Sequence, residues 1–454
     1  MKKLNDAQKT NGLTRRQFVG AGAAALASFT FVPKHVLANP PSGKLNVATI
    51  GAGGMGGGNT NNCAKAGANI VALCDADWRR ADGTFKRYPK AARYKDFRRM
   101  LDNEKNIDAV IVATPDHFHA VAAMAAMRRK KHVYVQKPLT RLVGEARALT
   151  EAARKYKVVT QMGNQGHSGD GVRDICEWIW AGVIGDVEEV HAWTNRPVWP
   201  QGIGRPTDKH DIPDGLDWDL WIGPSPMRPY HPCYLPFNWR GWWDFGGGAL
   251  ADMACHVLDP VFWALKLKYP TSVEASCTPV NDETFPLGSI VRYQFPARAS
   301  MPAVKVHWYD GGLKPDRPEA LEDNRKLNQA SSNVLFIGSK GVLRCGEYGD
   351  NPQLLPYTRM REFAKNKPAQ TLKRIKTSHE GNWVEACLAG GQATSHFDYA
   401  GPLAEMVTMG NLAIRPENVG KKLLWDGANM KVTNDATADE YVHPHYRDGW
   451  SLEM

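Results

Sequence analysis

Lys137, Asp252 and His256 are the side chains of this sequence best suited to acid–base chemistry. Lys137 follows a short apolar run after one intervening residue, Gln136, and an ammonium group in that position could stabilise a developing alkoxide. Asp252 and His256 are four residues apart in a helical pattern, so both project from one face of the helix. We predict that His256 accepts a hydroxyl proton and that Asp252 orients its imidazole. Which of Lys137 and His256 is the base stays open, because their titrations would be coupled.

A glycine-rich turn at residues 51–56 has the spacing of a dinucleotide-binding loop. It follows an apolar strand and opens a helical pattern, so its backbone can approach a pyrophosphate at the helix N-terminus. We therefore predict that the cofactor is bound by Gly51, Gly53, Gly54, Met55 and Gly56.

Asp75 ends the second predicted strand, where a carboxylate accepts hydrogen bonds from the adenosine ribose hydroxyls. Its negative charge favours NAD, since it repels the additional phosphate of NADP. NADP stays possible because Arg79 and Arg80 follow closely and could bind that phosphate.

Two further segments lie at the carboxyl ends of predicted strands, the edge at which open α/β sheets bind ligands. The first spans residues 112–119 and the second spans residues 134–138. From them we predict additional cofactor contacts by Thr114, Pro115, His119, Gln136 and Lys137.

An aromatic and proline-rich stretch from Pro197 to Trp243 could contribute to a carbohydrate site. Ten of the fifteen tryptophans fall between Trp178 and Trp263, and sugar rings stack on aromatic faces while their hydroxyls need polar partners. Many of these aromatic residues could equally be core. The predicted substrate contacts are Lys137, Asn164, His167, Arg196, Asp252 and His256, and His231 and Tyr234 are further candidates.

The chain is long enough for two domains. Strands predicted near 45–50, 69–74, 108–113, 132–135 and 157–161 alternate with helical patterns near 56–67, 117–130 and 141–156. This alternation predicts an α/β fold class, with an N-terminal doubly wound parallel sheet of the Rossmann type over residues 44–165. Residues 166–454 predict an α+β substrate and oligomerisation domain with a partly antiparallel sheet, including strands near 186–194, 289–295 and 304–308.

The first 38 residues have the features of a twin-arginine signal peptide. A basic region is followed by Arg15 and Arg16, by a small apolar run, and by Ala38 at a plausible cleavage site; residues 39–43 then form a linker. Half of the formal charge of +10 lies in this leader, so the remainder predicts no nucleic-acid partner. We expect export to the periplasm by the twin-arginine machinery, and no transmembrane segment in the mature chain. The eight cysteines lack metal-binding spacing, so no metal site is predicted.

The glycine turn, the triplet Gln136-Lys137-Pro138, and the run from Gly246 through Asp252 to His256 together resemble the glucose-fructose oxidoreductase / inositol dehydrogenase / MocA (Gfo/Idh/MocA) family. Residues 162–168, 397–402 and 446–450 resemble an exported branch of it. The resemblance implies a Rossmann domain, a C-terminal domain with a large open mixed sheet, and activity on sugars or inositols. Its usual Glu-Lys-Pro triplet maps onto residues 136–138, where Gln136 departs from the pattern by losing a negative charge.

These features predict an exported NAD(P)-dependent oxidoreductase that acts on a secondary hydroxyl of a sugar, a glycoside or an inositol-like polyol, with 3-keto-glycosides as possible products. Because soluble NAD is not maintained outside the cytoplasm, we expect the cofactor to be tightly bound before export. One alternative is an NAD-dependent glycosidase that oxidises, eliminates and reduces in a redox-neutral cycle. Another is a non-catalytic sugar-binding protein with structural NAD. We also expect a homo-oligomer, since an open sheet offers a surface for self-association.

Overall fold

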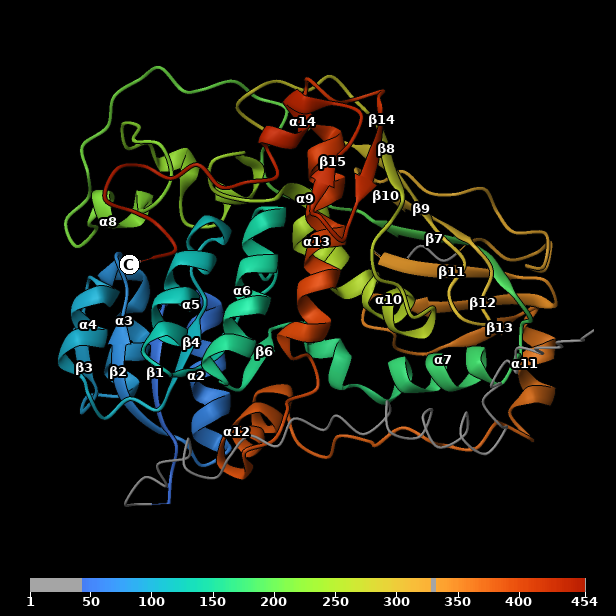
Figure 1. Ribbon diagram of the computed structural model, residues 1–454, viewed down its shortest axis with the longest axis horizontal. Helices are drawn as coiled ribbons and strands as arrows, with labels where there is room; N and C mark the ends of the chain where they lie inside the picture. Colours follow the sequence, from blue (N-terminus) through green and yellow to red (C-terminus); the bar gives the residue numbers. More distant parts are fainter. Residues whose placement is uncertain (1–42, 328–331, 454) are drawn as a thin grey trace, which may run out of the picture. The chain divides into compact units, whose positions relative to one another are not determined.

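Two β-sheets form the framework of residues 43–327 and 332–453, the part of the chain that the computed structural model describes (Figure 1). The predicted leader and nearly all of the predicted linker lie outside these residues.

The first sheet has six strands in the order β3-β2-β1-β4-β5-β6, and every neighbouring pair is parallel. This is the strand order of a dinucleotide-binding fold, in which ligands bind at the carboxyl ends of the strands. The predicted Rossmann sheet is thereby confirmed. The strands are β1 (Asn46–Ile50), β2 (Asn69–Cys74), β3 (Ala92–Tyr94), β4 (Ala109–Val112), β5 (His132–Val135) and β6 (Thr160–Met162).

Five α-helices connect these strands. Two of them, α3 and α4, begin at aspartates whose carboxylates accept backbone hydrogen bonds: Asp77 from the amide of Arg79, and Asp96 from the amide of Arg98. The helices are α2 (Gly54–Lys65), α3 (Trp78–Arg87), α4 (Phe97–Asn103), α5 (His119–Arg128) and α6 (Val143–Tyr156), with the short 3₁₀ helix η2 (Asp116–Phe118) before α5.

The second sheet has nine strands in the order β13-β12-β11-β7-β10-β9-β8-β14-β15. It is mixed, because β7 and β10 are parallel and the other neighbouring pairs are antiparallel. This confirms the predicted large mixed sheet. Its strands are β7 (Val187–Thr194), β8 (Ser272–Cys277), β9 (Ser289–Phe295), β10 (Val304–Tyr309), β11 (Ser332–Gly338), β12 (Gly341–Gly346), β13 (Gln353–Leu355), β14 (Lys422–Asp426) and β15 (Lys431–Val432).

Helices α9 and α13 pack against this second sheet, and α13 also packs against α6 of the first domain (Figure 1). The remaining helices are α7 (Asp170–Trp180), α8 (Trp218–Ile222), α9 (Gly248–Val257), α10 (Asp259–Ala264), α11 (Tyr357–Phe363), α12 (His379–Ala389), α13 (Phe397–Ile414) and α14 (Ala436–Glu440), with the 3₁₀ helices η3 (Gln165–Ser168), η4 (Pro232–Tyr234) and η5 (Asn238–Gly241). No helix of the described residues has the length and apolar character needed to cross a membrane.

Helix α12 returns to the first sheet although it lies late in the sequence. It packs against α2, and its Trp383 and Val384 share one buried apolar cluster with Leu73 and Tyr134. The C-terminal part of the chain therefore supports the helix that follows the glycine turn.

Eight of the ten tryptophans between Trp178 and Trp263 are buried. Several of them, with Tyr230, Tyr234 and Phe245, form a separate apolar cluster. Most of this aromatic stretch is therefore core rather than an open platform for sugars.

Candidate functional site

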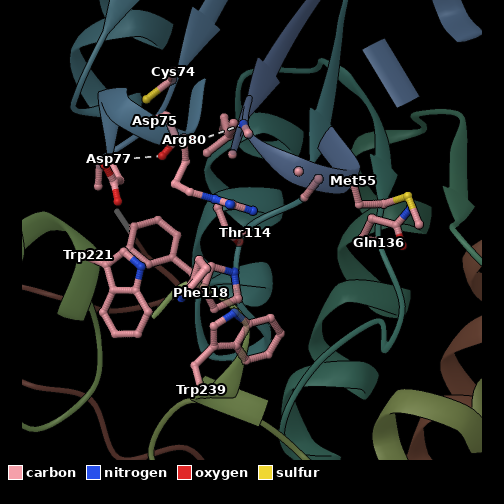
Figure 2. Close-up of a pocket in the computed structure, with 18 of the residues that line it drawn as sticks. Met55, Cys74, Asp75, Asp77, Arg80, Thr114, Phe118, Gln136, Trp221 and Trp239 are labelled. Atoms are coloured by element: carbon pink, nitrogen blue, oxygen red, sulfur yellow. Dashed lines mark hydrogen bonds between the residues drawn. The ribbon is translucent and has the colours of Figure 1, made fainter. Parts of the chain in front are cut away.

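A cavity of about 530 Å³ opens at the carboxyl ends of β1, β2, β4 and β5 (Figure 2). Much of the predicted cofactor set lines it: Gly51, Gly53, Gly54, Met55, Asp75, Thr114, Pro115, Gln136 and Lys137. Trp221 and Trp239, from the aromatic stretch that the sequence analysis connected with a carbohydrate site, also line it, as does Phe118. Its position is the one at which this fold binds ligands.

The glycine turn has positions that only glycine fits. Gly51 has a φ of +82°, and a Cβ there would lie 2.6 Å from the backbone of Ala113. A Cβ on Gly56 would lie 1.8 Å from the carbonyl oxygen of Gly51. Gly56 thus acts by letting α2 approach the turn closely, and it does not line the cavity.

The N-terminus of α2 suits a pyrophosphate. Gly53 caps the helix without a side-chain hydrogen bond, and the first turn carries no acidic residue. No side chain of α2 itself therefore compensates the positive end of its dipole beside the cavity. Together with the close backbone approach at Gly51, this fits the diphosphate of a dinucleotide.

Asp75 is fixed by two backbone donors. Its carboxylate oxygens accept hydrogen bonds of 2.9 Å from the amides of Gly53 and Asp77. Burial raises the pKa of Asp75 to about 6, although both hydrogen bonds oppose that shift. The carboxylate lines the cavity beside the glycine turn, so it can accept ribose hydroxyls (Figure 2).

Arg79 and Arg80, the two residues that could bind the additional phosphate of NADP, differ in their contacts. Arg79 donates to both carboxylate oxygens of Asp77, each at 2.7 Å, so its guanidinium is already paired. Arg80 lines the cavity (Figure 2). A second carboxylate, Asp77, also lines this end, which favours NAD over a cofactor with an added phosphate.

Lys137 and Asp252, which are far apart in sequence, form an ion pair. The Nζ atom of Lys137 donates to Oδ1 of Asp252 at 2.9 Å and to its carbonyl oxygen at 2.8 Å. Arg240 donates to the same Oδ1 at 3.2 Å, and Nε of Arg196 lies 3.6 Å from Oδ2. Burial alone would raise the pKa of Asp252, but Lys137 and Arg240 lower it to about 2.

The predicted hydrogen bond between Asp252 and His256 is absent. Both residues do lie on α9, but the Asp252 carboxylate turns to the three cationic side chains, which compete better for it than a neutral imidazole. His256 is buried, and its Nδ1 has no hydrogen-bond partner among the described residues. Burial and the charge of Lys137 lower the pKa of His256 to about 3, so the imidazole is neutral.

Asp116 and Arg240 were missed by the sequence analysis, and both line the cavity. Asp116 accepts a 3.1 Å hydrogen bond from the amide of Gly247, which joins η2 to the start of α9. Burial raises its pKa to about 7, against the lowering effect of Arg240 and Lys137. Asp116 lies in the segment 112–119 that the sequence analysis placed at a strand end.

Three predicted contact residues are enclosed by protein. His119 does not line the cavity; its ring nitrogens lie 2.7 and 2.9 Å from the carbonyl oxygens of Pro138 and Thr114, so it supports the cavity wall. Asn164 and His167 are 0% and 2% exposed and both contact the Asp259 carboxylate at 3.0 Å. The side chains of these three residues are therefore too buried to contact a substrate.

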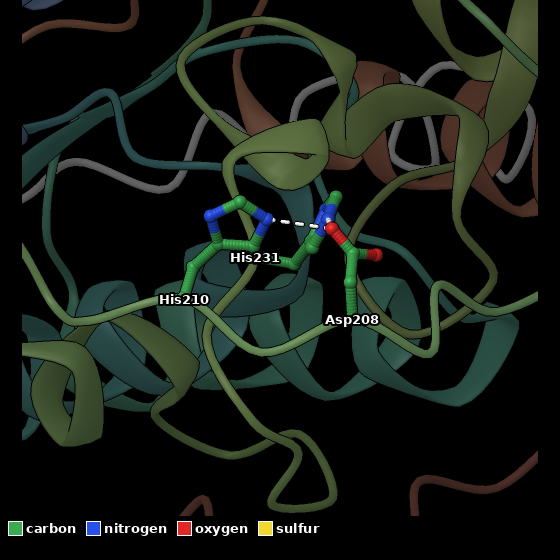
Figure 3. Close-up of side chains that lie close together, drawn as sticks. All are labelled: Asp208, His210 and His231. Atoms are coloured by element: carbon green, nitrogen blue, oxygen red, sulfur yellow. Dashed lines mark hydrogen bonds and ion pairs between the residues drawn. The ribbon is translucent and has the colours of Figure 1, made fainter.

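His231 belongs to a cluster with Asp208 and His210 (Figure 3). The Oδ2 atom of Asp208 lies 2.7 Å from Nε2 of His210 and 3.1 Å from Nε2 of His231. Nδ1 of His231 accepts the amide hydrogen of Cys233, so its Nε2 carries the proton that a metal ligand would have to lose. We therefore describe these residues as a hydrogen-bonded cluster and place no metal there.

Two domains of one oxidoreductase family match the chain. Residues 45–164 match "Oxidoreductase family, NAD-binding Rossmann fold" (GFO_IDH_MocA), and residues 186–296 match its "C-terminal alpha/beta domain". Together the matches cover half of the chain. The first curated relatives, among them inositol 2-dehydrogenases, are matched over less than half of their own length.

D-glucoside 3-dehydrogenase of Escherichia coli K12 is 25% identical over 71% of this chain and 84% of the relative. A glycosyl hydrolase family 109 protein of Shewanella pealeana is 30% identical over 38% of this chain and 44% of the relative. Among solved structures, the WlbA dehydrogenase of Bordetella pertussis in complex with NADH and UDP-GlcNAcA covers 84% of this chain and 99% of its own, with a TM-score of 0.59 and 16% identity. With both sheets, the glycine turn and both domain matches in agreement, the chain belongs to the Gfo/Idh/MocA oxidoreductase family and carries its NAD-binding Rossmann domain.

Proposed function

We propose that the protein is an NAD-dependent oxidoreductase that acts on a secondary hydroxyl of a sugar, a glycoside or an inositol-like polyol. The observation that carries this proposal is the ion pair between Lys137, at the edge of the dinucleotide cavity, and Asp252 on α9 of the other domain. Bound nicotinamide supplies the hydride acceptor. The chain itself then has to bind the substrate hydroxyl and manage its proton.

The contacts divide these tasks among a few side chains. Asp252 holds the Lys137 ammonium in place, and that ammonium can donate to a substrate oxygen as its negative charge develops. His256, on the same helix as Asp252, is neutral and has a ring nitrogen free to accept a hydrogen bond, but the burial that lowers its pKa also makes it a weak base. Lys137 and His256 both remain candidates for the base.

A secondary sugar hydroxyl is the favoured substrate group because of the relatives. The name of the E. coli relative specifies oxidation of a glucoside at carbon 3, and its match spans most of both chains. A 3-keto-glycoside is therefore the product we propose first.

Replacement of Lys137 by alanine tests the proposal. We expect NADH binding to persist, while NADH formation from an active sugar falls at least about 10²-fold, since one preorganised charge-stabilising donor is lost. Lys155→Ala, on the exposed part of α6, is the matched control and should retain full activity. Near-normal turnover by Lys137→Ala would remove this side chain from the mechanism.

A second candidate function is an NAD-dependent glycosidase, favoured by the match to the glycosyl hydrolase family 109 protein. Release of the aryl alcohol from aryl glycosides without added cofactor distinguishes it from simple oxidoreduction. If a broad sugar panel gives neither aglycone nor any change in nicotinamide absorbance, the remaining reading is a sugar-binding protein with structural NAD.

We also propose that the protein is exported folded, with NAD tightly bound, and that it forms a homo-oligomer. Export and tight binding are supported by the twin-arginine pattern of residues 1–38, which lies outside the described residues, together with the dinucleotide cavity. The oligomer is supported by the open nine-stranded sheet, which offers a surface for self-association. Mass spectrometry of ligand released from denatured periplasmic protein tests the cofactor part, and light scattering on the same sample tests the oligomeric state. A purified protein free of nucleotide would contradict tight binding.

A further inference from the structure

A buried carboxylate from α12 connects to the cofactor cavity through amide side chains. Oε1 of Glu380 accepts hydrogen bonds from Nδ2 of Asn59 at 2.7 Å and from Nδ2 of Asn62 at 3.2 Å. Oδ1 of Asn59 accepts from Nε2 of Gln136 at 2.9 Å, and Oε1 of Gln136 accepts from the amide of Lys137 at 3.2 Å. The last two residues line the cavity.

This series has only one consistent direction. A carboxylate can only accept, so Asn59 must present its NH₂ group to Glu380 and its oxygen to Gln136. Residue 136 must then donate, which an amide can do and a carboxylate cannot. Because Glu380 fixes the orientation of Asn59, residue 136 has to be a donor, and glutamine meets this need where an ionised glutamate would not.

Burial makes these hydrogen bonds costly to lose. Glu380, Asn59 and Gln136 are 3%, 1% and 5% exposed. Among residues 43–327 and 332–453, no lysine or arginine forms an ion pair with Glu380. Its charge is therefore met by the two asparagine amides and by its place in the first turn of α12, where the helix dipole favours an acid.

Packing also fixes the Gln136 amide from its other side. A Cβ on Gly163 would lie 2.9 Å from Nε2 and Cδ of Gln136, so the glycine leaves room for the amide and little else. Helix α12 lies against α2, which carries Asn59 (Figure 1). The hydrogen bond to Asn59 therefore sets the orientation of the Gln136 amide, and the close approach of Gly163 limits its movement.

We propose that Glu380 is a positioning residue of the cofactor site, which acts through Asn59 to orient the Gln136 amide and thereby the backbone that carries Lys137. It touches neither the cavity lined by the glycine turn nor any reacting atom. The inference rests on the proposed dinucleotide site. It adds a contribution to that site from α12, a helix of the C-terminal part of the chain.

An exchange of the two side chains tests this. Gln136→Glu places a second acceptor against Asn59, which cannot turn while Glu380 needs its NH₂ group; we expect NADH affinity to fall at least about tenfold. Glu380→Gln keeps an acceptor for Asn59 but no longer forces its orientation, so NADH affinity should fall, though less than in Gln136→Glu. In the double variant Asn59 can turn around, so affinity should return to within about threefold of the original protein. Glu385→Gln, an exposed acid on the same helix, should have no effect.

NADH fluorescence titrations of the full chain, well below the Tm of each variant, provide the measurement. A purely structural network would lower Tm and leave NADH affinity unchanged, which would overturn the inference, as would a double variant no better than Gln136→Glu. If Gln136→Glu does not fold, the double variant alone decides by whether it folds and binds NADH. No NADH binding by the original protein overturns the proposed function and this inference with it, whereas binding without rescue overturns this inference alone.

Discussion

The half-buried carboxylate of Asp75 should make cofactor binding depend on pH in a way that one substitution removes. In the cofactor-free protein its pKa is raised to about 6 by burial. At pH 7 about ten of eleven molecules then carry the ionised carboxylate that accepts ribose hydroxyls, whereas at pH 5 only about one in eleven does. The Kd for NADH should therefore rise about tenfold between pH 7 and pH 5.

Stability of the cofactor-free protein should show the opposite trend. Asp75 has a higher pKa folded than unfolded, from an ordinary value of 3.8 to about 6, so the folded state holds more protons between these values. Stability consequently falls as pH rises through this window, by about 3 kcal/mol for this one group. Protonation of Asp75 thus favours the folded apoprotein while it weakens cofactor binding.

Asp75→Asn is the variant that separates these effects. Asparagine keeps an acceptor for only one of the amides of Gly53 and Asp77, presents an NH₂ group to the other, and has no titrating group. We expect weaker NADH binding at pH 7 and no tenfold step between pH 7 and pH 5, as measured by fluorescence titration. Other groups, including Asp116, titrate equally in both proteins. A pH step that survives in Asp75→Asn, or a Kd of the original protein that does not change with pH, would refute the reasoning.

Two further predictions concern packing and protonation. Gly56→Ala should destabilise the fold by about 1–3 kcal/mol and weaken NADH binding, because the added Cβ would clash with the carbonyl oxygen of Gly51. Gly58→Ala is the control: its Cβ would have no atom within 4 Å, so it should change neither quantity in the same denaturation and titration assays. His132 accepts the amide hydrogen of Val159, and burial lowers its pKa to about 4, so the folded state keeps it neutral while the unfolded chain protonates it below its ordinary 6.5. The contribution of His132 to stability should thus fall by about 3 kcal/mol as pH drops from 6.5 to 4. In urea unfolding, His132→Gln, which retains an acceptor, should gain about that much stability relative to the original protein over this range; an unchanged difference would contradict the assignment.

In the first sheet the sequence predicted the apolar strands β1, β2, β4 and β5, and it missed the short β3. In the second sheet it predicted β7, β9 and β10 and missed others, among them the seven-residue apolar strand β11. Strands β1, β2, β4 and β5 lie within one residue of their predicted ends, because continuous apolar runs mark strands buried on both faces. β3 has three residues, none of them fully buried, and leaves no such pattern. The helices on either side of it did leave a signal, the capping aspartates Asp77 and Asp96.

The site was predicted where it depends on local sequence and missed where it depends on contacts across the fold. The glycine turn and Asp75 follow from their place in a strand–turn–helix unit. Arg240 comes to the cavity from η5, and α12 comes to α2 from far along the chain. Periodicity indicates that a helix has a buried face, but it does not name the partner of that face.

The ion pairs of Asp252 show how such contacts across the fold change the proposed role of His256. Helical spacing alone favours its interaction with His256, which would raise the pKa of the imidazole and make its charge depend on pH. In the fold, Lys137, Arg240 and Arg196 surround the carboxylate instead, so the imidazole is left neutral beside a fixed ammonium group. Charge stabilisation is thereby open to Lys137, while Lys137 and His256 both stay candidates for the base.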